Sequence, residues 1–172
     1  MPRFTLLQHN VGPHFQRPRD ASQSIAVGPV HWDWLFDPPM PASRLWTWAT
    51  DPLQPPDGTR PGKPNLLIAP ALRLEDHRSV YLEFEGEIGG QRGSVRQLAT
   101  GEYELLENAP ECFCIRATIL NSRFIARTSS VYVQFSQSRN ESNRSPSTPS
   151  TWTLRTESGV WDSGRWSNDA TL

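Results

Sequence analysis

The stretch His31-Trp32-Asp33-Trp34-Leu35-Phe36 decides the fold. Residues two apart on a β-strand face the same side, so a strand here places His31 and Asp33 on one face and Trp32 and Trp34 on the other. The tryptophan face is typical of a buried core. The stretch Leu45-Trp46-Thr47-Trp48-Ala49 is also rich in tryptophan, and we expect a second strand there.

Short segments of this kind continue along the chain. The 172 residues include 16 prolines and 11 glycines, spread so that no long helix fits between them. The segments between these residues are predicted to be strands: Phe4–Gln8, His31–Phe36, Leu45–Ala49, Leu66–Leu74, Tyr81–Ile88, Gly93–Leu98, Glu102–Leu106, Cys112–Leu120, Phe124–Arg127 and Val131–Phe135. Many short strands without a helix predict an all-β domain, either a closed barrel or a sandwich.

The length fits one domain, which we place at residues 1–136. Val11–Pro29 is a polar insert between two predicted strands, and Pro52–Pro64 is a loop rich in proline and glycine. Residues 137–172 are rich in serine, threonine and asparagine, a composition that forms no core of its own, and we expect a mostly flexible tail. Since large aromatic side chains usually dock, the alternative is partial docking through the tryptophans of this segment, Trp152, Trp161 and Trp166.

The composition indicates a soluble, cytoplasmic protein without a membrane partner. No apolar stretch approaches the roughly 20 residues needed to cross a bilayer, and the N-terminus lacks a signal-peptide core. The net charge of −1 does not point to a polyanionic partner. Lys63 is the only lysine; arginine suits bidentate phosphate contacts, although GC-rich codons would give the same bias. Cys112 and Cys114 are spaced poorly for a disulfide, and we expect reduced packing residues.

Two histidines and one aspartate are candidates for a metal site. His31 and Asp33 share a strand face and offer an imidazole and a carboxylate to a divalent ion. His9 ends the first predicted strand, and pairing of that strand with His31–Phe36 would add a third ligand, around a cation at an opening of the barrel. Three protein ligands with open positions are typical of a catalytic metal. The alternatives are an ordinary surface pair, a hydrogen-bonded His31 and a turn-capping His9.

The remaining histidines are His77 and His14. His77 lies in the polar segment Arg73–Arg78, four residues before Tyr81, where it could contact an oxyanion or protonate a leaving group. A solvated turn is the alternative. His14 follows a proline inside the insert, and the residues give no strong case for it as a ligand.

Charged residues form two further groups. The predicted strand Tyr81–Ile88 carries an acidic stripe, expected to be solvated or paired with Arg92 and Arg96, with metal ligation as the alternative; the stripe is Glu83, Glu85 and Glu87. The segment Ile115–Arg127 contains three arginines and no acidic residue. It is either a patch that follows a phosphate backbone or part of a charged barrel exterior.

Taken in order, several motifs resemble the 3′-phosphoesterase domain of bacterial DNA ligase D. They are the opening strand ending in His9, His31-Trp32-Asp33, Leu45–Ala49, Arg73–His77 through Tyr81, Phe84–Ile88, Gly93–Val95, Gly101–Glu104 and Ile119–Val133. The resemblance covers roughly residues 3–135 and leaves the tail unmatched. The ordered set carries the resemblance more than any single motif.

The resemblance implies a small closed β-barrel of about eight to ten short antiparallel strands. It implies removal of 3′-phosphates or 3′-ribonucleotides from DNA ends, with a ligase or polymerase of end-joining repair as a further partner. By position, the ligands of a Mn²⁺ ion would be His9, His31 and Asp33, and the residue types permit Zn²⁺ as well. His77, with Tyr81 nearby, would act on the scissile phosphate.

The chain departs from the family pattern in two places. Val11–Val30 separates His9 from the His-aromatic-Asp motif, so His9 can be a ligand only if this segment loops outward; His14 is the alternative. Leu35 stands where the family has an arginine, which removes a bidentate phosphate contact. The candidate replacements are Arg73, Arg78 and Arg92. We therefore expect an active phosphoesterase-like domain. The alternative is a catalytically inactive barrel that binds nucleic acid or protein. A third possibility is a structural barrel that docks through its tail in a repair assembly.

Overall fold

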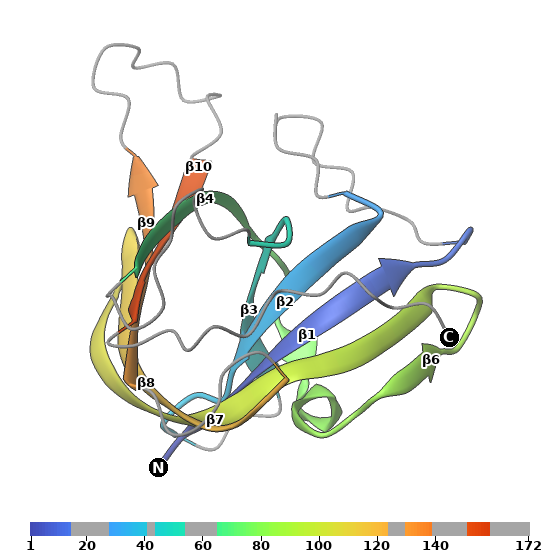
Figure 1. Ribbon diagram of the computed structural model, residues 1–172, viewed down its shortest axis with the longest axis horizontal. Helices are drawn as coiled ribbons and strands as arrows, with labels where there is room; N and C mark the ends of the chain where they lie inside the picture. Colours follow the sequence, from blue (N-terminus) through green and yellow to red (C-terminus); the bar gives the residue numbers. More distant parts are fainter. Residues whose placement is uncertain (15–27, 41–43, 54–64, 124–129, 139–150, 159–172) are drawn as a thin grey trace.

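The computed structural model describes residues 1–14, 28–40, 44–53, 65–123, 130–138 and 151–158. Within these residues, eight antiparallel strands form a closed barrel (Figure 1). The barrel strands are β1 Arg3–Val11, β2 Val30–Phe36, β3 Arg44–Thr50, β4 Asn65–Arg73, β7 Gly93–Ala109, β8 Cys112–Ser122, β9 Ser130–Ser138 and β10 Thr151–Ser158. Outside the ring lie β5 His77–Arg78, the 3₁₀ helix η1 Ser79–Leu82 and β6 Gly86–Ile88. The predicted all-β class and closed barrel are confirmed.

The barrel closes because β1 pairs on both of its sides. It is antiparallel to β2 on one side and to β7 on the other, and the ring runs β1-β2-β3-β4-β10-β9-β8-β7. β7 has 17 residues, long enough to pair with β1, β6 and β8. Bulges in the β1–β7 and β7–β8 pairings let the long strand bend around the ring.

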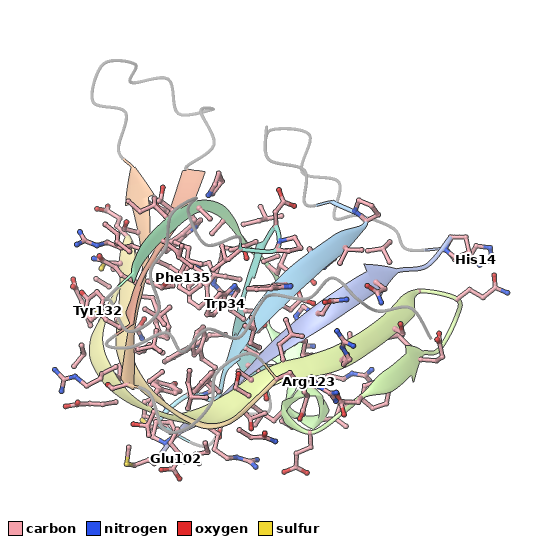
Figure 2. The ribbon with its side chains drawn as sticks, viewed as in Figure 1. His14, Trp34, Glu102, Arg123, Tyr132 and Phe135 are labelled. Atoms are coloured by element: carbon pink, nitrogen blue, oxygen red, sulfur yellow. The ribbon has the colours of Figure 1, made fainter. Side chains whose placement is uncertain are left out.

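Aromatic rings fill the barrel interior. The ring of Trp48 stacks on Phe113 and Phe135, with centroid distances of 4.8 and 4.7 Å. Trp34 meets Phe135 edge to face at 6.0 Å, and Figure 2 shows both side chains pointing into the barrel. The indole nitrogen of Trp34 donates a hydrogen bond to Thr50 Oγ1 at 3.1 Å. Trp34 and its neighbour Trp32, predicted as core residues, are both buried.

A second, smaller apolar cluster lies on the outer face of the barrel wall. The segment His77–Ile88, which contains β5, η1 and β6, covers this face of β1, β2, β3 and β7. The cluster consists of Leu7, Leu35, Leu45, Leu82, Ile88 and Val95, with Tyr81 and Phe84 packed against it. A hydrogen bond from Thr5 Oγ1 to the carbonyl of Leu82, 3.1 Å long, ties η1 to β1. We call this layer the outer cluster.

The predicted strand Tyr81–Ile88 is instead a 3₁₀ turn followed by the short β6. The carbonyl of Val80 accepts hydrogen bonds from the backbone N–H groups of Glu83 and Phe84, which turns the chain. The apolar residues of this segment still face the outer cluster: Leu82 and Ile88 belong to it, and Phe84 packs against it. Two glutamates of the acidic stripe pair with distant arginines instead of Arg92 and Arg96: Glu83 with Arg3 at 2.9 Å and Glu85 with Arg123 at 3.1 Å.

The barrel continues beyond residue 136. β10, Thr151–Ser158, lies between β4 and β9 and pairs with both, so the segment expected to be a flexible tail contributes one strand. Trp152 is buried against Trp48 with ring centroids 5.7 Å apart, which corresponds to the docked alternative. Trp161, Trp166 and the predicted strand Phe124–Arg127 lie outside the described residues, as does most of the two predicted loop segments.

Two smaller predictions concern the membrane and the cysteines. In the described part of the chain the helical segment is η1, with four residues, and no helix there is long and apolar enough to cross a membrane. Cys112 and Cys114 are free thiols on β8. Phe113 between them belongs to the barrel core, so the two thiols lie on the outer face of the strand.

We expect Trp152→Ala to lower the free energy of unfolding by about 3 kcal/mol, because it removes a buried ring that joins β10 to the core. Thr153→Ala on the opposite face of the same strand is the control and should change it by less than about 1 kcal/mol. Urea unfolding followed by circular dichroism measures both. Equal effects of the two substitutions would contradict the docking of β10 through Trp152.

Candidate metal centre

β1 and β2 bring His9, His31 and Asp33 together. In the antiparallel register His9 lies directly opposite His31, and Asp33 follows two residues along β2 on the same face. The Val11 N–H donates a 2.8 Å hydrogen bond to the carbonyl of Pro29, so the pairing persists up to the long insert. The three side chains are buried, with exposed fractions of 6%, 3% and 3%.

These three side chains project from the outer face of the barrel wall. On β2, Trp32 and Trp34 alternate with His31 and Asp33 and belong to the barrel core, as do Phe4 and Leu6 on the face of β1 opposite His9. Period-two alternation therefore sends His9, His31 and Asp33 to the opposite side, where the segment His77–Ile88 shares a pocket with His9 and Asp33. The expected place at a barrel opening is thus corrected to the outer wall.

The distances within the group suit a single ion. His31 Nε2 lies 3.4 Å from Asp33 Oδ1, and His9 Nδ1 lies 3.6 Å from Asp33 Oδ2. One ligand atom from each residue can be chosen so that all three lie within 4.8 Å of one another. Ligands bonded at about 2.1 Å to one ion are about 3.0–3.4 Å apart in tetrahedral or octahedral geometry. The widest spacing in the group would have to close by up to about 1.4–1.8 Å to complete coordination.

Backbone carbonyls hold both imidazole rings. His9 Nε2 is 3.2 Å from the carbonyl oxygen of Arg92, and His31 Nδ1 is 3.3 Å from that of Gly28. Because a carbonyl oxygen only accepts hydrogen bonds, these nitrogens carry the protons in the neutral rings. The other nitrogen of each ring then directs its lone pair toward Asp33. Metal-binding histidines are oriented in the same way.

The charge on Asp33 also fits a cation. Burial raises the pKa of this carboxyl, but hydrogen bonds and positive charge from the facing His31 and His9 rings, when these carry a second proton, lower it more, the charge of His77 adds to the lowering, and the resulting pKa is about 2. Beside such a positive partner the carboxylate is ionised at neutral pH, and within the described residues its buried Oδ1 has no hydrogen-bond partner of normal geometry. A divalent cation would neutralise this oxygen and use both imidazole lone pairs, so the residues fit a metal ion. The mixed nitrogen and oxygen set is compatible with Mn²⁺ and with Zn²⁺.

A pocket of about 90 Å³ connects this group with the other predicted site residues. It is lined by Leu7, His9, Asp33, His77, Tyr81, Ile88, Arg92 and Val95. His77 is held by β5, which pairs with β3, and its Nδ1 donates to the carbonyl of Glu75 at 2.9 Å, so Nε2 is the nitrogen left for a ligand. The rings of His77 and Tyr81 meet edge to face at 5.7 Å.

Of the three candidate arginines, Arg92 lines the pocket. Its Nε donates to the carbonyl of Gly89 at 2.8 Å. Arg73 is instead bound to Asp76 and stacked over the Trp48 ring at 4.5 Å. Arg78 is exposed and stands over the Tyr81 ring at 5.9 Å. The structure therefore brings one of the predicted phosphate-binding residues to the pocket and leaves two outside it.

Leu35 and His14 do not join the site. Leu35 is fully buried in the outer cluster, so β2 places an apolar side chain where the family pattern has an arginine. His14 is exposed and lies beyond the end of β1 (Figure 2). In the described residues, the glutamates of the acidic stripe are outside the candidate metal group as well.

Three groups that shape the site were not predicted from the sequence. Two are the backbone carbonyls of Gly28 and Arg92, which no side-chain pattern reveals. The third is Thr47, fully buried on β3, whose hydroxyl oxygen accepts a 3.4 Å hydrogen bond from the His77 backbone N–H. Thr47 belongs to the predicted strand Leu45–Ala49, but the role of its hydroxyl depends on tertiary contacts.

We expect one Mn²⁺ or Zn²⁺ ion to bind per chain, and Asp33→Asn to weaken binding by more than about 100-fold, because it removes the only charged ligand of the group. Isothermal titration calorimetry measures the affinity. His14→Ala is the control, since this exposed imidazole lies away from the group. An unchanged affinity of Asp33→Asn would show that the ion binds elsewhere.

Comparison with known proteins leaves the family open. The sequence matches no protein-family model and no curated protein. The resemblance to the phosphoesterase domain therefore depends on the ordered motifs of the chain, and the activity it implies is a proposal.

Proposed function

We propose that this chain is a metal-dependent phosphoesterase-like domain that acts on DNA 3′ ends. One observation carries the proposal: His77, Tyr81 and Arg92 line the same small pocket as His9 and Asp33. Metal ligands, a proton-transfer group and a cation are the components that phosphoryl-ester hydrolysis needs. DNA ends as substrate, a ligase or polymerase of end-joining repair as partner, and a cytoplasmic location come from the resemblance and the composition.

Each residue has a distinct role in this proposal. A metal ion held by His9, His31 and Asp33 would supply Lewis-acid polarisation of a phosphoryl oxygen. The guanidinium of Arg92 offsets the charge of the bound phosphoryl group. His77, anchored through Nδ1 to Glu75, offers Nε2 to the leaving oxygen, as a proton donor or a charge-stabilising group. Tyr81 packs against the edge of the His77 ring and restricts its orientation.

The alternative is a barrel that binds nucleic acid or protein without turnover. Leu35 in place of an arginine favours it, because one strong phosphate contact is missing. The pocket volume of about 90 Å³ favours it too, since small-molecule sites usually have volumes of roughly 300–1,000 Å³. Affinity for DNA that falls steeply with salt and does not depend on metal would support this alternative.

We expect release of phosphate from a 3′-phosphorylated DNA primer in the presence of Mn²⁺, and a loss of about 10²–10⁴-fold in kcat for His77→Ala, with the metal affinity unchanged. The loss follows from removing the proton-transfer group without touching a metal ligand. His14→Ala serves as the matched histidine control. No release with Mn²⁺, Zn²⁺ or Mg²⁺ would reject the enzymatic function and leave the binding barrel.

We expect Arg92→Gln to lower kcat/KM by about 10²–10³-fold, because this cation is the candidate that reaches the pocket. Steady-state kinetics with the same primer measure the change. The control is Arg155→Gln, which removes an exposed arginine of β10, a strand separated from β1 by at least three others around the ring. Similar losses in both variants would point to general electrostatic attraction of DNA instead of a pocket contact.

A further inference from the structure

The turn between β6 and β7 is fastened to the end of β1 through one carbonyl oxygen. The oxygen of Arg92 accepts a 3.0 Å hydrogen bond from the Gly12 N–H and a 3.2 Å hydrogen bond from His9 Nε2. The His14 N–H donates to the neighbouring carbonyl of Gln91 at 3.2 Å. A candidate metal ligand and the turn that carries Arg92 therefore share the same acceptor.

Two glycines make this approach possible. A Cβ atom at Gly12 would lie 2.2 Å from the carbonyl oxygen of Gln91 and 2.5 Å from the backbone nitrogen of Gly93. A Cβ atom at Gly93 would lie 1.9 Å from the carbonyl oxygen of Asn10, and Gly93 also has a positive φ of 105°. All of these contacts are to backbone atoms, which cannot swing away as a side chain does. We call Gly12 and Gly93 the glycine clasp.

We propose that the glycine clasp positions both His9 and Arg92 for the metal site. A side chain at either glycine has to push the turn away from β1, because distances near 2 Å are impossible between non-bonded heavy atoms. The Arg92 carbonyl would then separate from His9 Nε2, and the ring would lose the partner that fixes its tautomer. The Arg92 guanidinium would shift with its backbone. This positioning role concerns the same site as the proposed function, and it rests on that proposal because it presupposes a bound metal ion.

The need for a residue without a side chain applies to Gly12 and Gly93 and not to every glycine of the turn. For Gly89 in the same turn, none of the residues that the structure describes lies within 4 Å of the Cβ position, and Gly89 has no positive φ. Gly89→Ala is therefore a matched control that adds the same methyl group to open space. Gly12→Ala is the better test variant of the clasp, because Gly12 also lacks a positive φ and the effect is purely steric.

The first experiment measures metal binding by calorimetry with Mn²⁺ and Zn²⁺ alone. We expect Gly12→Ala to bind about 10–100-fold more weakly than the unsubstituted protein, the range typical of losing a group that orients a ligand. Gly89→Ala should bind with unchanged affinity. Far-UV circular dichroism verifies that both variants are folded. Wild-type affinity in a folded Gly12→Ala variant would overturn the inference.

The second experiment needs no metal and no activity. Nitrogen-15 NMR of the histidine rings at about pH 8.5, about two units above the ordinary imidazole pKa of about 6.5, reports which ring nitrogens carry protons. In the unsubstituted protein we expect Nε2–H for His9 and Nδ1–H for His31. In Gly12→Ala the His9 signal should move toward a mixture of tautomers while the His31 signal stays.

The two measurements separate the possible failures. If the unsubstituted protein binds no metal, the proposed function fails while the tautomer of His9 still tests the clasp. A His9 ring protonated on Nδ1 in the unsubstituted protein would overturn the clasp, even if Gly12→Ala does not fold. Retention of the His9 tautomer in a folded Gly12→Ala variant would overturn it as well.

Discussion

The register between β1 and β2 is the constraint on which the site depends. Paired residues alternate between core positions such as Leu6 with Trp34 and outer positions such as His9 with His31. A slip of one residue would turn the tryptophans outward and bury the polar side chains in the barrel. Because the inward aromatic rings supply most of the apolar burial on these strands, packing of the core fixes the register. The geometry of the three candidate ligands is thus a consequence of core packing on the other face.

On the outer wall the buried carboxylate of Asp33 needs a positively charged partner, and burial under the covering segment increases this need. Asp33 is buried and ionised, and a buried charge is costly unless it is paired. The outer cluster around Leu35 excludes water beside it, which strengthens every interaction of the carboxylate. The two imidazoles do not supply this positive charge while they are neutral. Their N–H groups are directed at backbone carbonyls, so their lone pairs face the Asp33 carboxylate. A proton or a metal ion resolves this conflict, and three converging donors favour the metal.

The sequence predicts the parts of this arrangement that follow from strand alternation. The pattern of residues 31–36 correctly separates the His31 and Asp33 face from the tryptophan face, and the pairing considered for the first predicted strand correctly brings His9 beside His31. It could not predict β10, whose serine- and threonine-rich sequence becomes a strand through pairing with β4 and β9. It also missed the outer location, because strand alternation does not say which layer covers a face. The carbonyls that hold the rings carry no side-chain signal at all.

Leu35 connects the departure from the family pattern with the architecture of the site. Its side chain belongs to the outer cluster together with Leu82 of η1, and η1 also carries Tyr81, which lines the pocket. An arginine at this position would place a guanidinium among leucines unless it reached the pocket. The leucine that lets the segment His77–Ile88 pack on the barrel wall is therefore the same residue that removes the phosphate contact. In the proposed function the positive charge comes from a turn instead of a strand, through Arg92. A turn is a less rigid support than a central strand. In this protein the glycine clasp, Gly12 and Gly93, lets the turn that carries Arg92 pack directly on the end of β1.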